Sequence, residues 1–405
     1  MTRRRGVGRA APSHQAEADP APSGGAIEQA GEVRSSAVES LRALAALAVL
    51  EGHVFGQSRG YGAGAYATVL DRGLLGGGMG VYLFFALTGY LLFRPFARRD
   101  LAGGRPLRYG RYAANRAVRI LPLYYTVLVV YILAFDHGGP ASTWWRGALF
   151  LENFFPATLN RVDGVMWSLV VEVQFYVLLP FLAWALARVA RGSARRAALA
   201  VVVLGVVAEL VRLATVTLPG STDVRWEYSL PGTFVFFTGG ILLAVVQTAW
   251  GERPPSWLRG WLARADVWAA AGVALWLVVV WRYNLDMLLV PAAFALVGSA
   301  VLPLRPGWST ALLRWRPLAT IGLASYSLYL WHFVLVVHLG SQPFMPHRFL
   351  PSLAVLAPLS VVAALVSYHL IEAPFLRLRR SWSAPDGRRR RGGVTAEVTP
   401  ATTTG

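Results

Sequence analysis

Long blocks of apolar residues, each of roughly 18 to 23 residues, constrain this chain more than any other feature of its sequence. A helix of that length crosses the hydrocarbon core of a bilayer, which is about 30 Å thick. We predict ten transmembrane helices, at about 37–56, 79–97, 118–135, 165–187, 197–217, 229–249, 267–282, 286–303, 318–340 and 350–372. The apolar stretch 144–155 is too short to span and is expected to be re-entrant or interfacial. The predicted fold is therefore an all-α, polytopic membrane protein.

The arginines predict how these helices are oriented. All 39 basic residues are arginine, and thirty of them fall in the termini and in every second connection, against seven in the other connections. An excess of basic residues marks the cytoplasmic side, so both termini are expected there, which favours ten spans over eleven. Charged residues make up only 15% of the chain, so its net charge of +18 reflects topology rather than a nucleic-acid partner.

Composition also limits the domains and the chemistry. Residues 1–36 and 377–405 are predicted to be disordered cytoplasmic tails around a transmembrane domain at 37–376. The chain has no cysteine and no lysine. Disulfides, thiolate metal sites and lysine Schiff bases are thereby excluded, and no metal site is predicted.

The first span carries two ionisable residues, Arg42 and His53, on one helical face. Their separation of eleven residues corresponds to three turns plus about 20°, or about 16 Å along the axis. Gly52 leaves the backbone beside His53 open to close approach. One interpretation is a cation and a titratable base that line one cavity. The other is a snorkelling arginine and a hydrogen-bonded core histidine.

The fourth span places Ser168, Glu172, Phe175 and Tyr176 on one face, at helical spacing. A carboxyl group among apolar side chains suits a proton acceptor or donor. The alternative is that Glu172 is a structural partner of an arginine.

The ninth span has a similar polar stripe, formed by Ser325, Tyr329 and His332. Three hydrogen-bonding groups on one face indicate a polar cavity. Hydrogen bonds between helices explain the same stripe equally well.

Eight arginines crowd the connection 94–119, and Arg116 and Arg119 lie one turn apart at its end. Guanidinium groups bind phosphates in a bidentate manner, so a phosphorylated ligand or anionic lipid headgroups could bind there. Positive-inside topology alone accounts for most of the eight. Glu372, in the last span, is expected to pair with a loop arginine.

Several of these motifs, taken in order, resemble the acyltransferase-3 family of integral-membrane acyltransferases. The matching segments are Arg42-x10-His53, Gly80–Gly89, Arg116-x2-Arg119-Ile-x-Pro122-x-Tyr124, Trp167–Tyr176, Ser325–His332 and Ser367–Phe375.

The resemblance implies ten spans and transfer of an acyl group, usually acetyl from cytoplasmic acetyl-CoA, to a sugar hydroxyl. It makes Arg42 and His53 the catalytic pair. Our hypothesis is that His53 acts as general base or transient acyl carrier, and that Glu172 tunes protonation or helps to orient the partner. Arg116, Arg119 and Tyr124 are expected to bind the acyl-CoA donor. The expected cavity residues are Ser168, Tyr176, Ser325, Tyr329 and His332.

The acceptor is expected to be a cell-envelope or exported polysaccharide, with a secondary metabolite such as a macrolide sugar as the alternative. A transporter or flippase is the rival from another class, although the sequence shows no internal symmetry. Some family members carry a fused extracytoplasmic domain. This sequence has no such extension, so we expect direct acylation or transfer to a separate acceptor-side protein. The predicted location is the bacterial plasma membrane.

Overall fold

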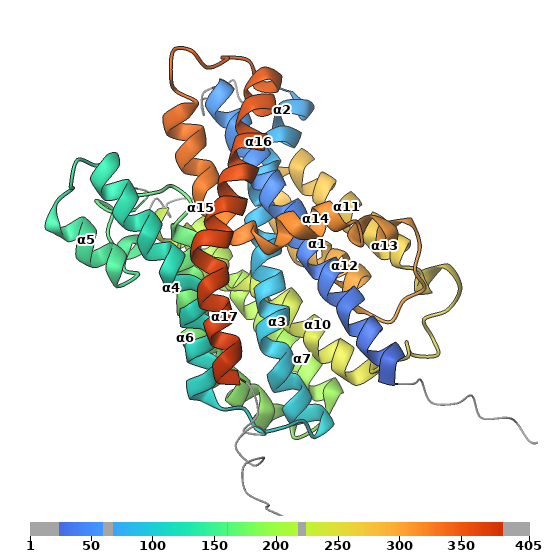
Figure 1. Ribbon diagram of the computed structural model, residues 1–405. Helices are drawn as coiled ribbons and strands as arrows, with labels where there is room; N and C mark the ends of the chain where they lie inside the picture. The colour runs from blue at the N-terminus through green and yellow to red at the C-terminus, as the bar shows by residue number, and fades with distance from the viewer. Residues whose placement is uncertain (1–23, 60–67, 160, 218–223, 384–405) are drawn as a thin grey trace, which may run out of the picture.

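The structure is a computed structural model, and it describes residues 24–59, 68–159, 161–217 and 224–383. Within these ranges it is a helical bundle without β-strands (Figure 1). The helices are α1 (Gly24–Arg59), α2 (Val69–Leu75), α3 (Gly80–Ala102), α4 (Tyr109–Ala134), α5 (Ala141–Ala148), α6 (Trp167–Ala190), α7 (Ala194–Arg212), α8 (Val224–Glu227), α9 (Leu230–Thr233), α10 (Val235–Trp250), α11 (Ala265–Trp281), α12 (Leu289–Val301), α13 (Trp308–Leu313), α14 (Arg316–Leu323), α15 (Ser325–Val334), α16 (Phe349–Ser367) and α17 (Ala373–Ser383). The prediction of an all-α protein is confirmed for this part of the chain.

Five continuous helical segments of the described chain are long and apolar enough to cross a membrane. They are Val69–Ala102, Tyr109–Ala134, Trp167–Ala190, Ala194–Val216 and Phe349–Leu378. The pair α14 and α15 makes a sixth if its 70° bend lies within one span. The helices α10, α11 and α12 are apolar but shorter, and α1 carries Glu39, Arg42 and Glu51 along its length. The count of ten spans therefore stays a prediction.

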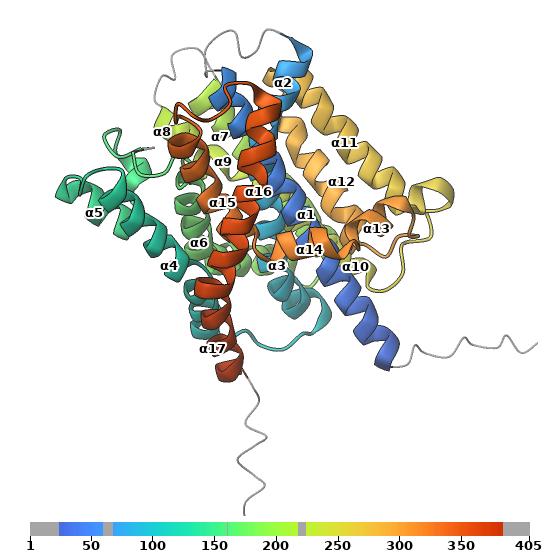
Figure 2. The same ribbon diagram turned by 45° about the horizontal axis from the view of Figure 1, so that its top comes forward.

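The predicted tails are partly helical. α1 already begins at Gly24, and α17 continues to Ser383. The rest of both tails lies outside the described residues. α1 begins and α17 ends toward the same end of the bundle, where the connection between α3 and α4 also lies (Figures 1 and 2).

Glycines allow the central helices to approach closely. A methyl group on Gly240 of α10 would overlap the carbonyl oxygen of Ala86 in α3, and one on Gly89 would overlap that of Phe237. Gly52 of α1 likewise lies against the backbone of Gly78. Small residues at such crossings are typical of membrane bundles, because packing and not the hydrophobic effect holds helices together there. These crossings set α1, α3 and α10 side by side at the centre.

The break between α14 and α15 creates a helix N-terminus inside the bundle. Glu372 occupies it: its Oε1 accepts hydrogen bonds from the Ser327 backbone N–H, at 3.1 Å, and from the Ser327 hydroxyl, at 2.6 Å. A carboxylate satisfies the unpaired N–H groups and complements the helix dipole at this end. The second oxygen of Glu372 lies 3.7 Å from Arg119, so the predicted pairing with an arginine is confirmed, although this arginine lies within α4 and not in a loop.

Candidate active site

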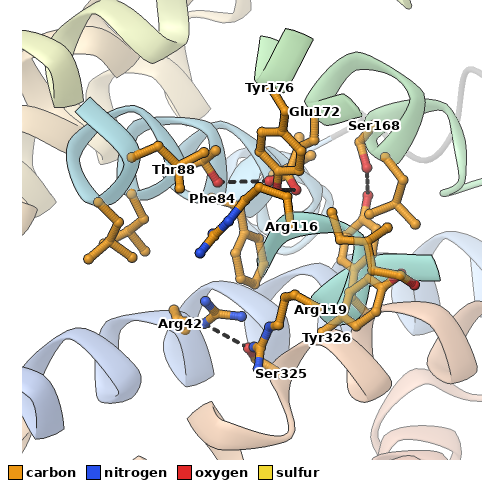
Figure 3. A pocket seen from close by; sticks show the side chains of 17 residues that line it. Arg42, Phe84, Thr88, Arg116, Arg119, Ser168, Glu172, Tyr176, Ser325 and Tyr326 are labelled. Atoms are coloured by element: carbon orange, nitrogen blue, oxygen red, sulfur yellow. Dashed lines mark hydrogen bonds between the residues drawn. The ribbon is translucent and has the colours of Figure 1, made fainter. Parts of the chain in front are cut away.

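A pocket lies where α1, α3, α4, α6 and α15 meet (Figure 3). It has a volume of about 730 Å³, including its open mouth. Most of the predicted site residues line it, together with apolar side chains. The lining residues with polar groups are Arg42, Thr88, Arg116, Arg119, Ser168, Glu172, Tyr176, Ser325, Tyr326 and Tyr329.

Three guanidinium groups face this pocket. Arg42 comes from α1, where its Nε donates a hydrogen bond to the Ser325 hydroxyl, at 3.0 Å, and lies 3.4 Å from a carboxylate oxygen of Glu39. Arg116 and Arg119 come from one face of α4 (Figure 3). The break before α15 brings Ser325 to Arg42. The arrangement suits a ligand with negative charge or a carbonyl oxygen on which charge develops.

Glu172 is the carboxylate in the pocket lining, and both of its carboxylate oxygens accept hydrogen bonds from hydroxyl groups. Thr88 donates to Oε1 at 2.8 Å, and Tyr176 donates to Oε2 at 2.7 Å. Tyr176 is the residue at i+4 on the same helix, as the predicted shared face requires. The two hydrogen bonds fix the direction in which the carboxylate points.

Ser168 and Tyr329 close one end of the pocket. Their hydroxyls form a 2.8 Å hydrogen bond, and the Phe84 ring packs against the Tyr329 ring with centroids 5.8 Å apart. The Tyr329 ring also lies next to the ring of His332, with centroids 5.8 Å apart.

His53 and His332 form a pair next to Tyr329, and neither histidine lines the pocket. Their Nδ1 and Nε2 atoms, respectively, are 3.1 Å apart. Nδ1 of His332 lies 3.0 Å from the Leu328 carbonyl oxygen, which can only accept a hydrogen bond, so this nitrogen carries a proton. Neutral His332 then accepts at Nε2, and His53 donates from Nδ1. The tautomer of His53 is thereby set, with Nε2 as its basic nitrogen.

The predicted pair of Arg42 and His53 does not share the pocket. Both residues belong to α1, but Arg42 lines the pocket and His53 does not. His53 contacts His332, whose ring lies next to that of Tyr329 in the pocket lining. The spacing in the sequence predicts a common helical face, but it carries no information on which of the two residues the pocket reaches.

Tyr124 lies away from the pocket, although it belongs to a motif predicted to bind the donor. It is fully buried, and its hydroxyl donates to the Gly147 carbonyl at 2.8 Å and lies 3.2 Å from Oε2 of Glu152. Burial raises the pKa of Glu152, which lies in a loop outside the spanning segments, to about 7. Tyr124 therefore anchors the α5 region to α4.

Sequence reasoning missed Thr88, Phe84 and Tyr326 as pocket residues. Thr88 had a usable signal, because it is a hydroxyl residue in an apolar helix and such residues seek partners inside a bundle. Among the described residues, no group of three or more His, Asp or Glu side chains could hold a metal ion.

Comparison with known proteins decides the family. A family model described as an acyltransferase domain, Acyl_transf_3, matches residues 35–371. The chain belongs to this acyltransferase family. The membership confirms the resemblance predicted from the motifs, and with it the predicted class of enzyme, a membrane acyltransferase.

Two of three bacterial relatives of this acyltransferase carry names that describe acetyl transfer to peptidoglycan. YrhL of Bacillus subtilis, named as a candidate peptidoglycan O-acetyltransferase, is 26% identical over 330 residues, which are 74% of this chain and 50% of YrhL. The peptidoglycan O-acetyltransferase OatA of Listeria monocytogenes is 24% identical over 331 residues, 74% of this chain and 49% of OatA. Nodulation protein 10 of Rhizobium leguminosarum is 26% identical over 329 residues, 75% of this chain and 83% of that protein.

The acyltransferase chain thus covers about half the length of YrhL and of OatA. No solved structure matches it.

Proposed function

We propose that this protein is a bacterial plasma-membrane O-acetyltransferase that moves an acetyl group from cytoplasmic acetyl-CoA to a hydroxyl of a cell-envelope polysaccharide. The observation that carries the proposal is the pocket inside the family domain, where three guanidinium groups and an oriented carboxylate converge. The names of the relatives support the glycan acceptor. We also propose ten spans with both termini in the cytoplasm, a topology supported by the distribution of arginines.

A second cleft supports the assignment of the donor. It lies between the end of α3 and the start of α4 and is lined by Arg105, Arg108 and Arg111, with the aromatic rings of Phe96 and Tyr112. Guanidinium groups suit phosphates, and aromatic rings suit a stacked base. The cleft shares residues with the pocket, namely Leu91, Leu92 and Arg116. A nucleotide-tailed thioester would bind with its phosphates in the cleft and its acyl end in the pocket.

The double variant with Arg105→Ala and Arg108→Ala is expected to raise the KM for acetyl-CoA at least tenfold. Hydrogen bonds to charged groups contribute about 1.5–3 kcal/mol each, and both residues lie outside the reacting pocket, so kcat should change far less. Steady-state kinetics of the purified enzyme, with adenosine 3′,5′-bisphosphate as competitor, measure this. The matched control is Arg316→Ala, an exposed arginine of α14. An unchanged KM in the double variant would remove the cleft from the donor site.

The proposed chemistry uses Nε2 of His53. As a general base, it takes the proton of the acceptor hydroxyl while that oxygen attacks the acyl carbonyl carbon. A C–O bond forms, the C–S bond breaks, and the proton passes to the departing thiolate. As an acyl carrier, Nε2 attacks the thioester carbonyl, so that an N–C bond forms, the C–S bond breaks and the thiolate leaves. The acceptor hydroxyl then attacks the acyl-imidazole: a C–O bond forms, the N–C bond breaks, and the hydroxyl proton passes to the thiolate. His53 does not line the pocket, so either route requires a rearrangement that brings its Nε2 to the acyl group.

The other predicted residues have supporting roles in this proposal. Arg42 stabilises negative charge on the acyl oxygen, and Glu172 orients a reacting group or tunes its protonation.

His332 fixes the tautomer of His53 through the hydrogen bond between the two rings. Arg116 and Arg119 lie at the inner end of the donor path, where Arg119 also pairs with Glu372.

Proteoliposomes that contain the full chain, acetyl-CoA with a labelled acetyl group and either a glycan or a hydroxylated small molecule test the function. Ester-bound label on the glycan supports the proposal, and label on the small molecule alone would replace the acceptor. Transfer that requires an added membrane or envelope fraction would indicate hand-over to a separate acceptor-side protein. Movement of a substrate without consumption of acetyl-CoA would indicate a transporter instead.

A further inference from the structure

An apolar groove runs along the outside of the bundle between α4 and α6, which lie side by side in Figures 1 and 2. With its open side it has a volume of about 1490 Å³. One wall has the small side chains of Ala113 and Ala117, one turn apart on α4, and this lack of bulk creates the hollow. The opposite wall is formed by α6 and is strongly exposed, with Phe181 67% and Trp184 56% accessible.

The inner end of this groove is the candidate active site. Arg116, Ile120 and Tyr176 line both the groove and the pocket. Tyr176 is the residue whose hydroxyl holds Glu172, at 2.7 Å. A chain that lies in the groove therefore has its end at the groups proposed to act on the thioester.

The pocket thus has two described continuations of opposite character. The cleft of Arg105, Arg108 and Arg111 is cationic and joins the pocket at Leu91, Leu92 and Arg116. The groove has almost no polar lining and joins it at Arg116, Ile120 and Tyr176. A thioester donor also has three parts: a phosphorylated nucleotide, a reacting carbonyl and a hydrocarbon chain. Each part matches one of the three connected spaces in charge and polarity.

We propose that the groove binds the acyl chain of the donor, so that the enzyme transfers acyl groups longer than acetyl as well as acetyl itself. The inference rests on the proposed acyl-CoA donor and extends it to chain length. The chain leaves the pocket between Arg116 and Tyr176 and lies along Ala113 and Ala117, with Val173 and Val177 opposite. Burial of each methylene outside water favours the longer donor, by up to about fourfold in kcat/KM per methylene.

The test compares kcat/KM for acetyl-, butyryl-, hexanoyl- and octanoyl-CoA with the purified full chain. We expect wild type to transfer the hexanoyl group as well as the acetyl group, with kcat/KM values within about tenfold of each other. The Ala117→Phe variant fills the groove and should reduce the ratio of hexanoyl to acetyl transfer at least tenfold. Val173→Trp, on the opposite wall, is the second variant in case the first does not fold. Leu133→Phe is the matched control, because this α4 residue is 59% exposed and lies outside the groove.

Wild type that transfers acetyl but no hexanoyl group would overturn the proposal, and so would an Ala117→Phe variant that keeps the wild-type ratio. Native mass spectrometry of the purified enzyme is the third measurement that tests the proposal. A phospholipid that stays bound to the enzyme at saturating hexanoyl-CoA, and that is lost in Ala117→Phe, would make the groove a lipid site and overturn the proposal as well. Absence of transfer from every donor, acetyl-CoA included, would instead overturn the proposed function on which the inference rests.

Discussion

The His53→Ala variant is expected to lose acyl transfer by at least about 10³-fold in kcat while it still folds and inserts into the membrane. General bases contribute about 10²–10⁴-fold, and a covalent carrier is indispensable to its own route. The loss should fall on kcat rather than on the KM for acetyl-CoA, because His53 lies beyond the pocket where the donor would bind. Labelled acetyl transferred to the glycan by purified enzyme, at saturating donor, measures the effect.

His369→Ala is the matched control for this variant. His369 is an exposed histidine near the end of the last predicted span, and the change should leave turnover near wild type. Wild-type turnover in His53→Ala would refute the assignment of His53. Labelled acetyl bound to wild type, absent from His53→Ala and released by hydroxylamine, would identify the carrier route. Turnover without such an adduct would favour the general base.

The sequence predicted those parts of the fold that depend on local pattern. Apolar blocks became the long helices α3, α4, α6, α7 and α16, because the length needed to cross a bilayer is visible in a linear sequence. The shared face of Glu172 and Tyr176 was also predictable, and the hydrogen bond between them follows from helical geometry. The pairing of Glu372 with Arg119 was predictable in kind, since a buried carboxylate needs a partner.

The other features of the fold and of the site depend on how helices that are distant in sequence pack together, and no local sequence pattern predicts that packing. No local pattern predicted the helix break at Ala324, which brings Ser325 to Arg42 and creates the N-terminus that Glu372 occupies. Nothing in the spacing of Arg42 and His53 showed that only Arg42 would line the pocket. Tyr124 belongs to a motif next to the pocket arginines, but it lies further along α4, where its hydroxyl contacts Gly147 and Glu152. A charge that must be satisfied is predictable, whereas the identity of its partner often is not.

The Arg42→Ala variant is expected to reduce kcat by about 10²–10³-fold, the range found when a donor to a developing oxyanion is removed. Arg42 is one of three guanidinium groups in the pocket, and Ser325 and Glu39 hold it in place through its Nε. Arg116 and Arg119 remain in the variant, so donor binding should survive and the KM for acetyl-CoA should change much less than kcat.

The Arg42→Lys variant separates charge from geometry. A lysine ammonium restores a positive charge but not the planar fork that can donate to Ser325 and to an acyl oxygen at once. We therefore expect partial recovery, to within about tenfold of wild type. Arg195→Ala, an exposed arginine at the start of α7, should leave both constants unchanged. If Arg42→Ala raised KM and left kcat intact, Arg42 would only bind the donor. Stabilisation of the transition state would then fall to Arg116, the guanidinium group that the pocket shares with both the cleft and the groove.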